Sequence, residues 1–161
     1  MKRFHVLPFA VAVLSLSALT SCSNDDEYNS EIPRFSDVEI VSLDGSQNIS
    51  VGKAFVVTPT ESKSGKLLDR TKYQWTSTPE GITHKYATTV VYGTKGSSPS
   101  DTIVATTPGT YTLSFRGEYQ VSGLNLNYDE SQETPSGAKI TYKTLSWQKY
   151  EVTITKDIVV D

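Results

Sequence analysis

The stretch from Thr110 to Val121 alternates strictly between apolar and polar side chains. One face carries Tyr111, Leu113, Phe115, Tyr119 and Val121, with Gly117 in phase. The other face carries Thr110, Thr112, Ser114, Arg116, Glu118 and Gln120. Because successive side chains of a β-strand point to opposite faces, this alternation predicts a strand that is buried on one side and solvated on the other.

The same period of two recurs along the rest of the chain, and no amphipathic helix of useful length follows Cys22. The last predicted strand has its apolar set at Tyr150, Val152, Ile154, Ile158 and Val160. The other predicted strands are Val38–Leu43, Ala54–Thr58, Lys72–Ser77, Ile82–Tyr92 and Thr102–Thr106. Many short strands separated by Gly- and Pro-containing turns predict an all-β sandwich or barrel. We assign it to residues 34–161 as one domain.

Two segments leave alternatives open. Ile140 and Tyr142 share the phase of Tyr150, but Leu145 and Trp147 are one residue out, which predicts a bulge or bend near Lys143–Thr144. Residues 123–137 fit either a long loop or an extra hairpin.

The first residues are typical of a secretory signal. Lys2 and Arg3 precede an apolar run from Val6 to Leu19. This run is shorter than the roughly 20 apolar residues that a membrane-spanning helix needs. A positive start, a short apolar middle and a small-residue end predict a signal peptide over residues 1–21.

The sequence Leu19-Thr20-Ser21-Cys22 resembles a lipobox, the site at which bacterial lipoproteins are lipidated on cysteine and cleaved before it. Cys22 is the only cysteine of the chain, and lipidation accounts for a thiol that would otherwise be unpaired in an exported protein. The resemblance implies that Cys22 carries the lipid and that the membrane is a partner through this N-terminal anchor.

An acidic cluster, Asp25, Asp26 and Glu27, follows directly. It resembles the signal that sends Bacteroidetes lipoproteins to the outer face of the outer membrane, which implies a surface location. The alternative is a plain solvated tether, since acidic sequence of low hydrophobicity stays disordered. In both cases we expect residues 22–33 to form a flexible acidic tether.

Removal of residues 1–21, which include Lys2 and Arg3 and no acidic residue, changes the net charge from −3 to −5. An acidic domain lacks the basic face that nucleic-acid binding requires. We therefore expect no nucleic-acid partner.

Three motifs resemble an immunoglobulin-like sandwich and, within that class, the PKD-like domains of bacterial surface lipoproteins. They are Tyr73-Gln74-Trp75, Thr107-Pro108-Gly109-Thr110-Tyr111-Thr112-Leu113 and Tyr150-Glu151-Val152-Thr153-Ile154. The resemblance implies that Trp75 fills the core and that the Tyr111 hydroxyl ties back to the backbone at a strand corner. Two departures are that Leu113 stands where antibody domains have cysteine, and that Thr76-Ser77-Thr78-Pro79 replaces an Asp-rich turn.

Catalytic groups are scarce. His84, the only histidine after the signal peptide, shares the phase of Ile82 and Tyr86, which favours a structural role. No Gly-x-Ser-x-Gly motif occurs, and one histidine without a free cysteine cannot supply a usual zinc site. The candidate carboxylates lie in turns or on solvated strand faces. We therefore expect no enzyme, no metal and no cofactor.

The remaining candidates for a ligand site are aromatic residues that stack on sugar rings: Trp147, Tyr128, Tyr142 and Tyr119. Asp101-Thr102-Ile103 resembles the Bacteroidetes O-glycosylation acceptor, which makes Thr102 a candidate modification site. These features favour a non-catalytic binding or accessory module whose ligand is a glycan or an outer-membrane protein. The alternative is a structural subunit or inhibitor that acts through protein contact in the envelope.

Overall fold

The computed structural model describes residues 29–92, 99–123 and 128–161. Cys22 and the cluster Asp25, Asp26 and Glu27 lie outside the described residues. The strands are β1 (Arg34–Ser42), β2 (Ala54–Lys63), β3 (Leu68–Thr78), β4 (Ile82–His84), β5 (Thr88–Tyr92), β6 (Asp101–Ala105), β7 (Gly109–Val121), β8 (Glu130–Glu133), β9 (Lys139–Ser146) and β10 (Lys149–Val160). Within these ranges, no helix is long and apolar enough to cross a membrane.

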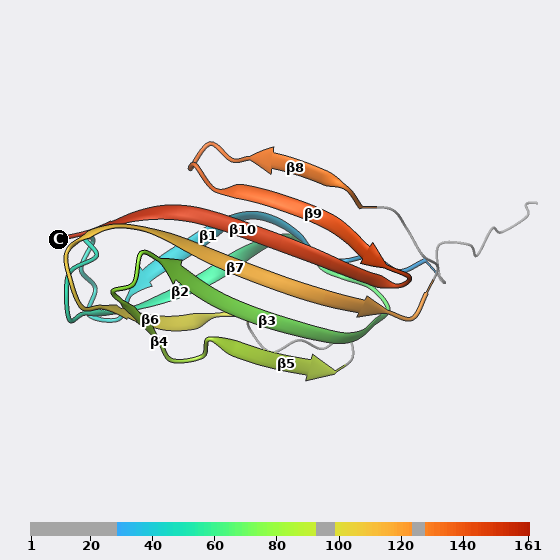
Figure 1. Ribbon diagram of the computed structural model, residues 1–161, viewed down its shortest axis with the longest axis horizontal. Helices are drawn as coiled ribbons and strands as arrows, with labels where there is room; N and C mark the ends of the chain where they lie inside the picture. The colour runs from blue at the N-terminus through green and yellow to red at the C-terminus, as the bar shows by residue number, and fades with distance from the viewer. Residues whose placement is uncertain (1–28, 93–98, 124–127) are drawn as a thin grey trace, which may run out of the picture.

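The strands form two antiparallel sheets that face each other as a sandwich (Figure 1). One sheet has the order β1-β2-β6-β4, which is the A-B-E-D order of immunoglobulin-like domains. The other has the order β5-β3-β7-β10-β9-β8, in which β3-β7-β10 corresponds to C-F-G and β8 and β9 extend the sheet. The predicted all-β sandwich is therefore confirmed, with immunoglobulin-like strand order.

The core contains the residues that the period-two pattern selects. Trp75 on β3 is only 2% exposed, and its ring lies 5.2 Å from that of Phe115 on β7. At the start of β7, the Tyr111 hydroxyl donates a hydrogen bond to the Thr107 carbonyl at 2.8 Å, as the strand-corner prediction requires. The β10 residues Tyr150, Val152, Ile154, Ile158 and Val160 are all buried.

The prediction of one strand over Ile82–Tyr92 is wrong. The segment forms two short strands, β4 in the four-stranded sheet and β5 at the edge of the six-stranded sheet. Tyr86 and Tyr92, which the pattern grouped with core residues, are exposed. The inward-facing positions change from Ile82 and His84 on β4 to Thr89 and Val91 on β5. The apolar pattern of the sequence continues without this shift, so it gives no sign that the chain crosses from one layer to the other.

The boundary of the tether also changes. Residues 29–33 belong to the domain, because Ser30 and Ile32 are buried and the backbones of Glu31 and Lys66 exchange two hydrogen bonds. The described part of residues 123–137 contains β8, which pairs with β9 and supports the hairpin alternative. The irregularity in β9 lies at Leu145, since Tyr150 opposes Thr144 and Lys149 opposes Ser146.

Candidate functional site

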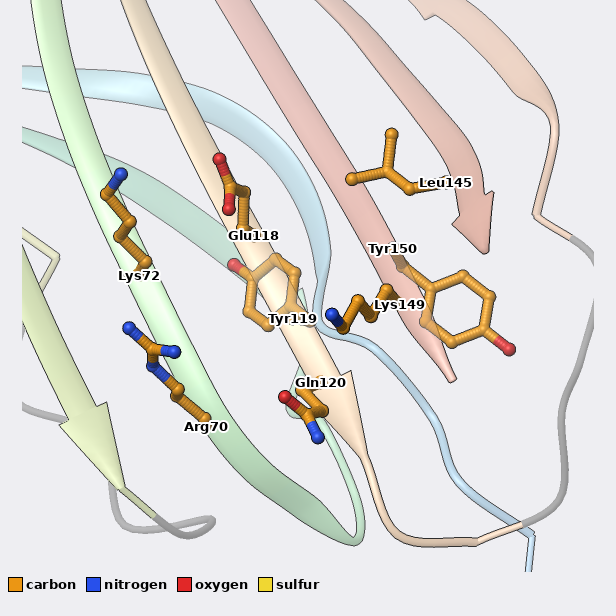
Figure 2. Close-up of a pocket in the computed structure, with 8 residues that line it drawn as sticks. All are labelled: Arg70, Lys72, Glu118, Tyr119, Gln120, Leu145, Lys149 and Tyr150. Atoms are coloured by element: carbon orange, nitrogen blue, oxygen red, sulfur yellow. The ribbon is translucent and has the colours of Figure 1, made fainter. Parts of the chain in front are cut away.

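A hollow of about 200 Å³ lies on the outer face of the six-stranded sheet, at the end where β3 and β10 begin and β7 and β9 end. Its lining residues are Arg70, Lys72, Glu118, Tyr119, Gln120, Leu145, Lys149 and Tyr150 (Figure 2). It is therefore built from four adjacent strands, and its polar side chains come from the solvated phase of the same alternation that makes the core.

Strand register explains why these side chains meet. Arg70 on β3 lies opposite Gln120 on β7, and Gln120 lies opposite Lys149 on β10. On its other side Arg70 lies opposite Tyr92 of β5, with its guanidinium carbon 6.0 Å from the centre of the Tyr92 ring. Since neighbouring strands are about 4.8 Å apart, the four side chains form one row across the sheet.

The hollow is lined by three cationic side chains and one carboxylate. Among the described residues, no carboxylate oxygen lies within 4 Å of the side-chain nitrogens of Arg70, Lys72 or Lys149. Glu118 pairs instead with Arg116, which lies two residues earlier on the same face of β7, at a distance of 3.1 Å. Arg116 also pairs with Glu151 at 2.6 Å, which raises its pKa. The local charge is therefore positive, although the whole chain is acidic.

The structure separates the four predicted aromatic candidates. Trp147, in the turn between Leu145 and Lys149, is 72% exposed and remains a candidate. Tyr119 and Tyr142 are buried, so the prediction that they stack on a ligand is wrong. Tyr119 belongs to the core phase of β7, and burial raises its pKa well above the usual value.

Tyr128 and Tyr142 are occupied by the protein itself. The Arg34 guanidinium lies 4.9 Å from the centre of the Tyr128 ring and 4.6 Å from that of Tyr142. The rings of Tyr128 and Tyr150 also form a T-shaped pair with their centres 5.2 Å apart, and the Tyr142 hydroxyl accepts a hydrogen bond from the Phe35 N–H. Neither ring offers a free stacking face as Trp147 does.

Sequence reasoning missed Tyr92 as a surface residue. It is 75% exposed and stands at the β5 edge of the row that contains Arg70. The missing information was the break at residues 85–87, because only the division into β4 and β5 shows that Tyr92 lies outside the core. Neither Tyr92 nor Trp147 lines the hollow itself, but Tyr92 lies opposite the lining residue Arg70, and Trp147 lies in the turn that joins β9 to β10.

A second polar group lies where the two sheets meet. His84 Nδ1 on β4 is 2.7 Å from Asp101 Oδ2 on β6, and His84 Nε2 is 3.1 Å from Ser77 Oγ on β3. This is the order of partners found in serine hydrolases. A hydrolase also needs a substrate cleft with donors for an oxyanion. Neither Ser77 nor His84 lines the hollow described above.

Asp101 has structural partners for both of its oxygens. Its side chain is fully buried, and Oδ1 accepts the backbone N–H groups of Tyr86 at 2.6 Å and Thr102 at 2.7 Å. Ser77 continues the inward phase of Tyr73 and Trp75, so its hydroxyl points toward the space between the sheets. The group therefore joins β3 to the edge of the opposite sheet beside the core, which is the structural role expected of His84.

Thr102, the candidate O-glycosylation site, lies on β6 and pairs with Val56 of β2. Both of its neighbours in the motif, Asp101 and Ile103, are buried. The motif is thus part of a folded strand, and its modification remains a prediction. The described residues contain no group of three or more His, Cys, Asp or Glu side chains arranged to hold a metal ion.

Comparisons of the chain with protein-family models, with curated proteins and with solved structures find no match.

Proposed function

We propose that this protein is a lipid-anchored lipoprotein of the outer membrane that faces the cell surface and acts as a non-catalytic binding module. The anchor is the lipid on Cys22, and the ligand is a glycan bound on the outer face of the six-stranded sheet. The sandwich is of the PKD-like kind. Support for the address comes from the Leu19–Cys22 box and from the acidic residues that follow it.

One observation carries the proposed activity: two exposed rings adjoin residues that line a polar hollow, Tyr92 opposite Arg70 in the sheet and Trp147 in the turn between Leu145 and Lys149. Aromatic rings next to hydrogen-bonding and charged groups suit a sugar, which has apolar ring faces and polar edges. Large aromatic side chains this exposed have no packing role, since each leaves about three quarters of its surface in water.

The test is affinity electrophoresis of the full-length protein, purified in mild detergent, through gels that contain one neutral or one acidic polysaccharide. Retardation of the wild type, and its loss in Trp147→Ala and Tyr92→Ala, is the expected result. Tyr86→Ala is the matched control, because Tyr86 is an exposed aromatic that is neither paired with a lining residue nor in a turn between two of them. No retardation in any gel, with a protein recovered instead from a membrane pull-down, favours the structural subunit or inhibitor.

The address is tested separately. Cys22→Ser should abolish lipidation, so the protein should no longer partition with the membrane. If Asp25, Asp26 and Glu27 act as the surface signal, replacing all three by Ala should protect the protein from protease added to intact cells. Equal digestion of wild type and variant would reduce this cluster to a tether.

A further inference from the structure

We infer that the hollow selects an acidic polysaccharide, one that carries carboxylate or sulfate groups on its sugar rings. This inference rests on the proposed binding function and narrows the ligand from glycans in general to acidic glycans. The selecting groups are Arg70, Lys72 and Lys149, and the rings that accompany them are Tyr92 and Trp147.

Positive charge is in excess around the hollow. Arg70 and Lys72 on β3 and Lys149 on β10 surround one hollow from the two sides of β7, and within the described ranges none of them forms an ion pair with a carboxylate. Glu118, the single acid of the lining, is held by Arg116 at 3.1 Å. Like charges held close together repel each other, so an anion placed among them gains from all three.

This positive site lies in an acidic protein. The chain has 18 acidic and 15 basic residues, so its overall field repels polyanions and only a local cluster can attract them. A neutral sugar needs no such cluster, because hydroxyl groups are bound well by neutral donors such as Gln120. The concentration of cations in the hollow therefore points to an anionic group in the ligand.

The order of the side chains across the sheet also fits an acidic polysaccharide. Tyr92, Arg70, Gln120 and Lys149 follow one another across β5, β3, β7 and β10. Arg70 presents donors suited to a planar carboxylate or a sulfate, and Gln120 offers an amide between the two cations. Tyr92 at the edge supplies a ring face. An extended chain that alternates sugar rings with anionic groups matches this sequence of contacts.

The experiment measures binding of the full-length protein in detergent to four polymers at 50 mM and 500 mM salt. They are polygalacturonate, which carries carboxylates, dextran sulfate, neutral dextran, and polyglutamate as an anionic polymer without sugar rings. Arg70→Gln and Lys149→Gln remove one charge each from the hollow. Lys139→Gln is the matched control, since Lys139 is an exposed lysine on the same face of the same sheet but outside the hollow.

We expect polygalacturonate or dextran sulfate to bind more tightly than dextran, with the stronger of the two identifying the anionic group. Each hollow variant should weaken that binding about fivefold, the effect of losing one exposed charge contact, and 500 mM salt should weaken it further. Lys139→Gln should bind as the wild type does. Trp147→Ala should weaken binding without changing its salt dependence.

Four outcomes overturn the inference. Equal binding of dextran and polygalacturonate that still requires Trp147 would leave the proposed glycan function intact and remove the charge selectivity. Polyglutamate bound as tightly as the acidic polysaccharides would replace the glycan by an acidic peptide. Lys139→Gln weakening binding as much as Lys149→Gln would assign the effect to the general charge of the sheet. Binding of no polymer at all contradicts the proposed function as well.

Discussion

Lys156 Nζ on β10 lies 2.8 Å from Asp37 Oδ1 on β1, so an ion pair joins the two facing sheets. Asp37 Oδ1 also accepts the hydroxyl of Ser136 at 2.7 Å and the Val38 N–H at 2.7 Å. Partial burial acts to raise the pKa of Asp37, but the hydrogen bonds from Lys156, Ser136 and Val38 outweigh it and hold the pKa below its usual value. The carboxylate is thus stabilised in its charged form.

This pair predicts a pH-dependent part of the stability. A carboxyl whose pKa is lower in the folded state stabilises the fold above the unfolded pKa, about 4, and loses that contribution as pH falls through the folded pKa. Because Asp37 is about one third exposed, we expect Asp37→Asn to cost only about 1 kcal/mol at pH 7. Urea unfolding at pH 7 and at pH 2.5 should show this difference shrinking at the lower pH.

The control is Asp69→Asn, which removes one charge from an exposed position on β3. It should leave the free energy of unfolding nearly unchanged at both pH values. A loss of the same size in both variants would mean that net charge, and not the bond to Lys156, produces the effect.

Tyr111 and Tyr119 lie on the same face of β7 and predict opposite results for the same substitution. The Tyr111 hydroxyl is hydrogen-bonded to the carbonyl and the hydroxyl of Thr107, so Tyr111→Phe should cost about 1–3 kcal/mol. Among the described residues the buried Tyr119 hydroxyl has no partner, so Tyr119→Phe should be neutral or stabilising. Thermal unfolding of both variants tests this, and a larger loss for Tyr119→Phe would contradict it.

We expect the Ser77–His84–Asp101 group to stabilise the fold, and we expect Ser77 not to react as a nucleophile. Asp101→Asn disturbs a fully buried carboxylate that accepts three hydrogen bonds, and should cost about 2–3 kcal/mol. Ser77→Ala removes one bond of a partly exposed residue and should cost about 1 kcal/mol or less. A fluorophosphonate probe should not label Ser77. Labelling that His84→Ala abolishes would contradict the non-catalytic proposal.

The sequence predicts the strands that have one buried face and one solvated face. β7 and most of β10 bury alternate residues, which is the direct consequence of a sheet packed on one side, although Lys156 stands in the inward phase of β10. The same rule already placed Tyr119 in phase with Leu113 and Phe115, so its burial was readable from the pattern. The prediction for residues 82–92 fails because the chain changes sheets after the three residues of β4, and the inward-facing positions change from Ile82 and His84 to Thr89 and Val91.

The candidate site was less predictable because it depends on register between strands that are distant in sequence. Arg70, Gln120 and Lys149 are neighbours only once β3, β7 and β10 are paired. The same holds for Asp101, because its carboxylate is bonded to the His84 side chain and to the Tyr86 N–H, which are distant from it in sequence. Exposed aromatics at edges and turns are the only local signal, and Trp147 was found by it.

The two tryptophans give the last prediction, since one lies in the core and the other in solvent. Trp75 is 2% exposed and its Nε1 donates to the Pro99 carbonyl, so Trp75→Ala should cost about 3–5 kcal/mol. Such a loss would remove much of the 5–15 kcal/mol that stabilises a typical domain. Trp147→Ala should change the free energy of unfolding by less than about 0.5 kcal/mol, because its ring packs on little.

Urea denaturation measures both changes, and acrylamide quenching provides an independent check. With only two tryptophans in the chain, the fluorescence that acrylamide quenches should come from Trp147 and disappear in Trp147→Phe. The remaining emission should be blue-shifted and protected, as expected of Trp75. If Trp147→Ala were as destabilising as Trp75→Ala, Trp147 would be a packing residue. Its ring would then not be free to contact the glycan that we propose as the ligand.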